Sequence, residues 1–152
     1  MSTLKKILIP LILTLSLHAG AMSPEMNTSV GAQTSWPVTG QFGVGAALNF
    51  PLTSLIFFPY LSFDVNGVEY LDKKVYYREI NYGAGAKLLL SSLIYRGTLG
   101  RMYRMYEKLV DESWRAELGF GTIIQNMEIT LNYRHYYPLE KRAVVITIGW
   151  VF

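Results

Sequence analysis

Seven charged residues alternate with apolar ones along the chain, so their side chains would share one face of extended segments. Four are basic and three are acidic: Glu79, Lys87, Arg96, Arg115, Glu117, Glu128 and Arg134. In a confined interior such a mixed set could line a gated polar path or a proton route. It could instead form a lumen plug in which opposite charges pair. The width of the enclosing structure decides between these two hypotheses.

A second set of residues could support hydrolysis. His135 is the one histidine after residue 21, and Ser113 and Glu140 could join it if neighbouring strands brought the three together. A lone histidine at the end of a strand is more typical of an interface position, so the sequence favours a protein that is not an enzyme. The chain has no cysteine and no clustered carboxylates, which predicts no metal site and no cofactor.

Eight segments show the period-two alternation of a β-strand and would position these residues. They span 27–36, 41–50, 55–65, 78–90, 93–100, 114–125, 128–134 and 143–152. Residues 101–111 could extend the fifth strand or form a short helix, and the pattern favours a strand. Tight turns are expected at 51–54, 91–92 and 126–127, and longer charged loops at 66–77 and 106–113.

The two faces of these segments differ in composition. One carries large apolar residues and almost no charge, whereas the other is polar and includes Gly43, Gly83 and Gly119. A soluble barrel of the lipocalin kind would point its large residues inward, but glycines suit the crowded inside of a narrow barrel. The sequence therefore predicts an all-β fold, a transmembrane antiparallel up-and-down β-barrel of eight strands. So narrow a lumen favours the ion-paired plug over a steady pore.

The first 21 residues have the features of a secretory signal peptide. Lys5 and Lys6 precede an apolar run at 7–17, and Ala19 and Ala21 supply the small residues of a cleavage site. We therefore expect a signal peptide at 1–21 and a barrel domain at 22–152. Two of the 14 basic residues lie in this signal, which leaves 12 against 11 acidic residues. A net charge this small gives no indication of nucleic-acid binding.

The end of the chain carries a further pattern, Gly149-Trp150-Val151-Phe152. Together with the eight alternating segments, it resembles the OmpA/OmpX-like eight-stranded outer-membrane barrels. The resemblance implies a monomer in the cell outer membrane, among its lipids, with a structural or surface-interaction role in the bacterial envelope. It also implies that Gly149, Trp150 and Phe152 form the signal read by the barrel-assembly machinery.

Basic residues gather toward the expected outer end, where they could contact the phosphates of lipopolysaccharide. They are Lys73, Lys74, Arg101, Lys141 and Arg142, with Arg104 and Lys108 nearby. Interspersed acidic residues fit ordinary solvated loops equally well, and both interpretations stay open.

A narrow channel and a lipid A deacylase of the PagL type are the alternatives to a structural role. In the deacylase family a serine closely follows the histidine on one strand. Here His135 is followed by Tyr136-Tyr137-Pro138, which disfavours that activity.

Overall fold

The computed structural model describes residues 22–34, 39–70, 73–106 and 109–152. These residues form eight strands: β1 (Ser23–Gln33), β2 (Thr39–Leu52), β3 (Leu55–Tyr70), β4 (Lys73–Leu90), β5 (Leu93–Tyr106), β6 (Leu109–Ile124), β7 (Met127–Tyr137) and β8 (Lys141–Val151). Within this described part, no helix is long and apolar enough to cross a membrane. The predicted signal peptide at 1–21 and its cleavage site lie outside the described residues.

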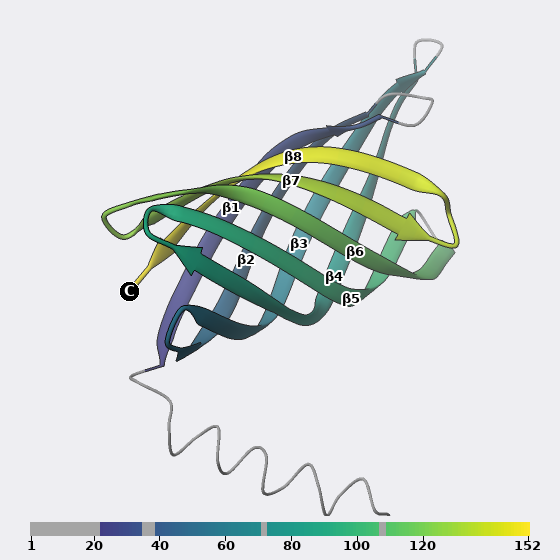
Figure 1. Cartoon of the computed structure of the whole chain (residues 1–152). Helices are drawn as coiled ribbons and strands as arrows, with labels where there is room; N and C mark the ends of the chain where they lie inside the picture. Colours follow the sequence, from purple (N-terminus) through teal and green to yellow (C-terminus); the bar gives the residue numbers. More distant parts are fainter. Residues whose placement is uncertain (1–21, 35–38, 71–72, 107–108) are drawn as a thin grey trace, which may run out of the picture.

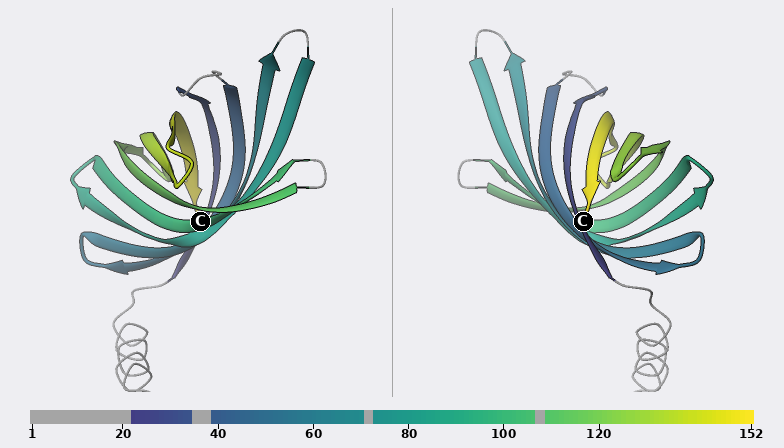
Figure 2. Two further views of the ribbon diagram at one scale, coloured as in Figure 1. Left: turned by 90° about the vertical axis from the view of Figure 1, so that its right-hand side faces the viewer. Right: turned by 90° about the vertical axis from the view of Figure 1, so that its left-hand side faces the viewer.

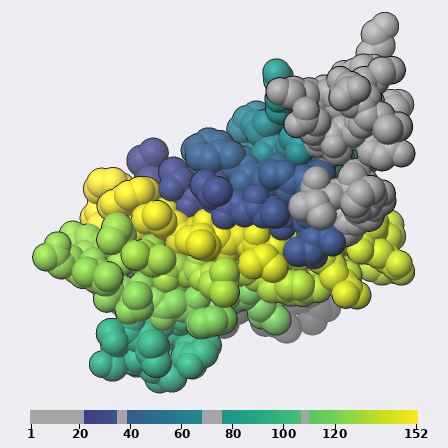
Figure 3. Space-filling view, turned by 90° about the horizontal axis from the view of Figure 1, so that it is seen from above, coloured from purple at the N-terminus to yellow at the C-terminus, as the bar shows by residue number. Residues whose placement is uncertain are grey.

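Every strand pairs antiparallel with its neighbours in sequence, and β1 also pairs with β8, so the sheet closes into a barrel (Figure 1). The closing ladder runs from Glu25↔Val151 to Gln33↔Ala143. Figure 3 shows β8 lying alongside β1 on the outer wall. Closure pairs the two edges that β1 and β8 would otherwise expose. The prediction of an all-β, eight-stranded antiparallel barrel is confirmed.

Several strands extend further than their alternation predicts. Residues 66–70 and 73–77 belong to β3 and β4, and residues 109–113 belong to β6, so the loops expected at 66–77 and 106–113 are wrong in extent. β3 and β4 form a long hairpin that projects past the neighbouring strands (Figure 2). β5 continues to Tyr106, which confirms a strand over 101–106.

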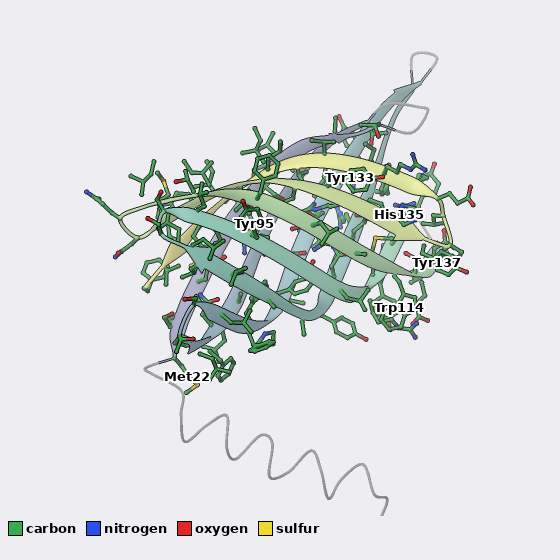
Figure 4. All side chains as sticks on the ribbon, in the orientation of Figure 1. Met22, Tyr95, Trp114, Tyr133, His135 and Tyr137 are labelled. Atoms are coloured by element: carbon green, nitrogen blue, oxygen red, sulfur yellow. The ribbon has the colours of Figure 1, made fainter. Side chains whose placement is uncertain are left out.

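Three two-residue turns join β2 to β3, β4 to β5 and β6 to β7 at the end of the barrel that also holds Met22 and the C-terminus (Figures 1 and 4). The third turn is Gln125–Asn126, one residue before its expected place. Thr53, Ser91 and Gln125 begin these turns with φ values of 56°, 59° and 57°. A positive φ at the first turn residue is a feature of the primed turns, which match the twist of an antiparallel hairpin.

The polarity of the barrel is the reverse of that of a water-soluble protein. Among the described residues, 22 polar or charged residues are buried against nine apolar or aromatic ones. The outer wall instead exposes large apolar side chains, such as Leu118 at 70% and Phe120 at 59%. Soluble proteins bury such residues and expose charges. The strand faces predicted from the sequence therefore have the expected orientation.

Glycines make room for the polar interior, as their positions predict. A Cβ atom on Gly43 would overlap the carboxylate of Asp64, and one on Gly119 would overlap the side-chain amide of Asn132. Without these glycines, the interior side chains would have to move.

Candidate functional site

The barrel interior contains ten buried charged residues, five acidic and five basic. The acidic ones are Glu25, Asp64, Glu79, Glu117 and Glu128, and the basic ones are Lys87, Arg96, Arg104, Arg115 and Arg134. They come from β1 and from β3 through β7. The structure thus brings all seven residues of the predicted set into the interior and adds three more. At full ionisation the ten formal charges cancel.

The first group of the interior network lies toward the end with the two-residue turns. Lys87 is fully buried, and its Nζ donates to both carboxylate oxygens of Glu128, at 2.8 and 2.9 Å, and to Glu25. Asn49 donates from Nδ2 to the Glu25 carboxylate at 3.1 Å. The Lys87 ammonium also lies 5.1 Å from the ring centre of Phe58. One cation on β4 therefore serves two carboxylates, one from β1 and one from β7.

The second group is centred on Asp64. Its carboxylate accepts hydrogen bonds from Arg115 Nη1 at 2.9 Å, Arg134 Nη1 at 3.2 Å and Asn81 Nδ2 at 2.8 Å. Arg134 Nε also donates to Glu117 at 2.5 Å. Buried charges of this kind are tolerated only when each one is paired and hydrogen-bonded.

Arg96 completes this central group more loosely. Its Nε lies 3.9 Å from the nearest Glu117 oxygen, and its guanidinium lies 5.2 Å from the Phe58 ring centre. The contact is too long for a hydrogen bond, so Arg96 contributes mainly through its charge. Glu117 keeps its close partner Arg134 whether or not Arg96 is present.

The third group lies toward the opposite end of the barrel. Two nitrogens of Arg104 donate to one oxygen of Glu79, at 2.5 and 2.9 Å. The guanidinium lies 4.5 Å from the ring centre of Tyr77, and Lys141 lies 5.7 Å from the same ring. The expected place of Arg104 among the outer-surface cations is therefore wrong, because this residue is buried in an ion pair.

Little space remains between these side chains. The cavity bordered by Arg96, Arg115, Glu117 and Arg134 has a volume of about 20 Å³. A water molecule needs roughly 10–15 Å³ measured in this way, so the cavity has room for about one. In this region the interior is filled by paired side chains and has no open aqueous path.

The hydrolytic set predicted from the sequence does not assemble. The Ser113 side chain is buried in the interior, whereas His135 lies on the outward face of β7 between Tyr133 and Tyr137 (Figure 4). Serine and histidine therefore lie on opposite faces of the barrel wall, and the histidine cannot activate the hydroxyl. Among the described residues, no group of three potential metal ligands is close enough to hold an ion.

The predicted lipopolysaccharide contacts separate into different environments. The Arg101 side chain, 39% exposed, is on the outer wall, where its guanidinium lies 4.8 Å from the Trp114 ring and pairs with Glu112. Arg142 is exposed on β8 beside His135. Lys141 instead faces the mouth of the interior, above Tyr77. Lys73 and Lys74 belong to β4, but their side chains are outside what the structure describes, and Lys108 is also outside it.

Arg101 belongs to a row of side chains that crosses four strands on the outer wall. Tyr82, Arg101, Trp114 and Tyr137 are successive register partners from β4 to β7. Figure 4 places Trp114, His135 and Tyr137 toward the same end of the barrel. Aromatic and basic residues in such a row are typical of a membrane–water boundary.

The three residues of the predicted assembly signal lie on the last strand and just beyond it. Gly149 faces the interior, and a Cβ atom there would come within 2.9 Å of Glu25. Trp150 is 41% exposed and Phe152 is 71% exposed. The Phe152 N–H donates to the carbonyl of Pro24 at 2.9 Å, which holds the end of the chain against β1. Recognition of these residues by the assembly machinery stays a prediction.

The sequence pattern contained the signal for the three interior residues that the predicted set lacks. Arg104 has the same strand parity as Arg96, and Glu25 has the parity of the inward-facing Ser29. Asp64 lies on the face that the alternation assigns to the interior. Extending the first and fifth segments by period two would have found Glu25 and Arg104, and Asp64 already lay within the segment predicted at 55–65.

Solved structures share this fold. Ail, the attachment invasion locus protein of Yersinia pestis, was solved with the heparin analogue sucrose octasulfate; it aligns with a TM-score of 0.58 and 12% identity, over 86% of this chain and 97% of that one. The N-terminal β-barrel domain of Pseudomonas aeruginosa OprF aligns with a TM-score of 0.57 and 10% identity, over 86% and 97%. The outer membrane enzyme PagL aligns with a TM-score of 0.56 and 12% identity, over 83% and 98%.

The chain has the fold of the eight-stranded outer-membrane β-barrels. This outcome confirms the fold implied by the resemblance of the sequence to the OmpA/OmpX-like proteins. No protein-family model matches the chain, and no curated protein matches its sequence. Because one barrel of this fold is an enzyme, the fold by itself does not decide whether this barrel has an activity.

Proposed function

We propose that the barrel is an integral outer-membrane protein with a structural or surface-interaction role in the bacterial envelope. In this proposal the 1–21 segment directs export, and the eight strands span the outer membrane. The observation that carries the proposal is the inverted polarity, with charges buried inside and Leu, Phe and Ile side chains exposed outside. Lipid is the solvent in which such a surface is stable.

Strand length supports insertion. The strands contain between 11 and 18 residues, and a tilted strand needs about 9–11 residues to cross the hydrocarbon layer. The projecting β3–β4 hairpin and the Arg101 row then lie toward the outer surface, and the three two-residue turns toward the periplasm. Short periplasmic turns are usual in bacterial barrels.

The paired interior supports a barrel that does not conduct. The five buried cations and five buried anions occupy the bore, and the cavity among them has room for about one water. We expect the purified protein to give no steady current steps in planar bilayers. Regular steps at constant voltage would instead favour the narrow channel.

Anionic lipid headgroups are the proposed partners of the outer-wall cations. Arg101 and Arg142 are exposed there, and the similar barrel Ail was solved with a sulfated sugar. We expect the double variant Arg101→Ala, Arg142→Ala to bind purified lipopolysaccharide about 30-fold more weakly, because each of the two exposed charges contributes about 1 kcal/mol near an anionic surface. Lys141→Ala is the control, since its ammonium lies at the mouth of the interior. Equal binding of lipopolysaccharide by the wild type, the double variant and Lys141→Ala would exclude the outer-wall site.

Cell fractionation tests the proposal as a whole. Full-length protein should lose residues 1–21, appear in the outer-membrane fraction, and run at a different apparent mass on gels before and after heating. Lipid A from the same cells should keep all its acyl chains, because Ser113 and His135 lie on opposite faces of the wall. A mature protein that stays monomeric in water without detergent would contradict the membrane assignment.

A further inference from the structure

We propose that the outer wall over β2 and β3 is a binding site for one acyl chain of a membrane lipid. The inference rests on the proposed function, because only a barrel inserted in the membrane presents this wall to lipid. It goes further, since it assigns a defined site and ligand class to one part of that wall.

The first observation is a gap in the wall's hydrogen-bonded ladder. β2 and β3 keep one register on both sides, with Ala47↔Tyr60 and Phe50↔Phe57 as flanking pairs, but residues 48 and 49 have no partner in β3. Pro59 lies opposite this gap, and proline has no N–H to donate to a ladder. The other ladder of β3 is continuous there, with Pro59↔Ala84 among its pairs. Within the described strands, the interruption is therefore a local seam between β2 and β3.

The second observation is a shallow surface hollow over that seam, which is open on its outer side. It has a volume of about 390 Å³ and is lined by Ala46, Ala47, Leu48, Pro59, Tyr60 and Leu61. Ala47 and Tyr60 belong to the interior-facing set. Because the hollow touches inward-facing as well as outward-facing residues, its floor reaches the backbone of the strands. The surface is recessed between Leu48 and Leu61, because Ala46 has a small side chain and Pro59 has a compact ring.

A second hollow continues the first along the strands. Its volume is about 370 Å³, and it shares Ala46 and Leu61 with the first. It extends to Val44 on β2 and to Phe63 on β3, and it also touches Met26 on β1 and Ile80 on β4. The two hollows therefore form one trough that follows β2 and β3 and widens over β1 and β4 at its far end. Lipid acyl chains extend inward from one membrane surface, and a strand tilted by about 45° runs partly along that direction.

The chemistry of the trough identifies the ligand class. None of the residues that line either hollow is charged. Behind the seam, Phe58 packs with Ala47 and Tyr60 in an apolar cluster, within an interior that is otherwise rich in ion pairs. A headgroup would find no charged partner here. An unbranched hydrocarbon chain lying in this shallow trough would make more dispersion contacts than it would on a smooth wall.

Ala46→Phe and Ala116→Phe form a matched pair of test variants. Both alanines are exposed on the outward face, one in the trough on β2 and one on β6 outside it. The purified proteins are reconstituted into phosphatidylcholine vesicles that contain a small fraction of phosphatidylcholine with a diazirine in its acyl chain. After irradiation, mass spectrometry maps the labelled residues. In the wild type we expect about fivefold more label on residues 44–63 than on residues 114–124, which corresponds to roughly 1 kcal/mol of preference.

The phenyl ring of Ala46→Phe fills the trough and should abolish this preference, whereas Ala116→Phe should leave it unchanged. Pro59→Ala is a second variant, which restores an N–H and lets the ladder close; it should reduce the label on residues 44–63 without adding bulk. Labelling spread evenly over the wild-type wall overturns the proposed acyl-chain site. A preference for residues 44–63 that survives both Ala46→Phe and Pro59→Ala also overturns it. In either case, label on both walls still supports insertion. A wild-type protein with no acyl-chain label on any strand overturns the membrane proposal together with the site.

Discussion

Replacing Lys87 with methionine tests whether the interior ion pairs hold the barrel together. The ammonium group of Lys87 is fully buried and donates to Glu128 at 2.8 and 2.9 Å as well as to Glu25. Methionine has a similar length and fills the same volume without a charge. The variant therefore keeps the packing but leaves two carboxylates buried without their common cation.

Removing one partner of a buried ion pair costs about 3–5 kcal/mol, because the remaining charge stays desolvated and unpaired. Asn49 still donates to Glu25 in the variant, at 3.1 Å, so one of the two carboxylates keeps a partial partner. We expect Lys87→Met to lower the free energy of unfolding by about 4 kcal/mol. The triple variant Lys87→Met, Glu25→Gln, Glu128→Gln removes all three charges and should recover most of that loss.

The assay is urea unfolding in phosphatidylcholine vesicles, followed by tryptophan fluorescence and by the heat-dependent shift in gel mobility. Arg142→Met is the matched control, since it removes a basic charge from an exposed position on β8 and should leave the unfolding curve unchanged. The reasoning is refuted if Lys87→Met unfolds within about 1 kcal/mol of the wild type. A triple variant no more stable than the single one would refute it as well.

Three further predictions test other parts of the barrel. Arg134→Met should lower the free energy of unfolding by about 3–5 kcal/mol in the same assay. Arg96→Met should lower it by less than about 1 kcal/mol, because the closest contact of Arg96 to Glu117 is 3.9 Å. Equal losses in the two variants would contradict this ranking. Thr53→Gly should stabilise the barrel by about 0.5–1 kcal/mol, because a β-branched residue is strained at a φ of 56°; a lower urea midpoint would count against it. Deletion of Phe152 should leave protein in the periplasmic fraction of expressing cells, and normal outer-membrane insertion would show that this residue is not needed for assembly.

The number of strands, and which face of each strand points into the barrel, could be predicted from the period-two alternation of polar and apolar residues. The large side chains of β8 alternate with small ones, and the large ones are the more exposed, on the outer wall as expected. Strand ends could not be predicted in the same way. Residues 66–70 and 73–77 carry charges and tyrosines at both odd and even positions, and residues 109–113 carry the adjacent acids Asp111 and Glu112. Their alternation therefore fades, although their backbones continue to pair. A hairpin beyond the lipid needs no apolar face, and its sequence resembles that of a loop.

The partners within the ion-pair network were beyond sequence reasoning. Arg134 reaches Asp64 across 70 residues of sequence, and Lys87 reaches Glu25 across 62. Alternation places such residues in the interior but does not say which of them meet. That choice depends on the stagger of the strands around the closed barrel, which sets the height of each residue in the bore.

The same network explains how the wall tolerates its seam. Hydrogen bonds between neighbouring strands normally hold a barrel closed, yet the β2–β3 ladder is interrupted beside Pro59. Asp64 connects β3 to Arg115 on β6 and Arg134 on β7, which are strands that β3 does not pair with in the wall. These contacts cross the bore and hold β3 from within, so its position depends less on the ladder to β2. A plugged interior therefore lets one part of the wall give up backbone pairing and form an apolar trough without opening the barrel.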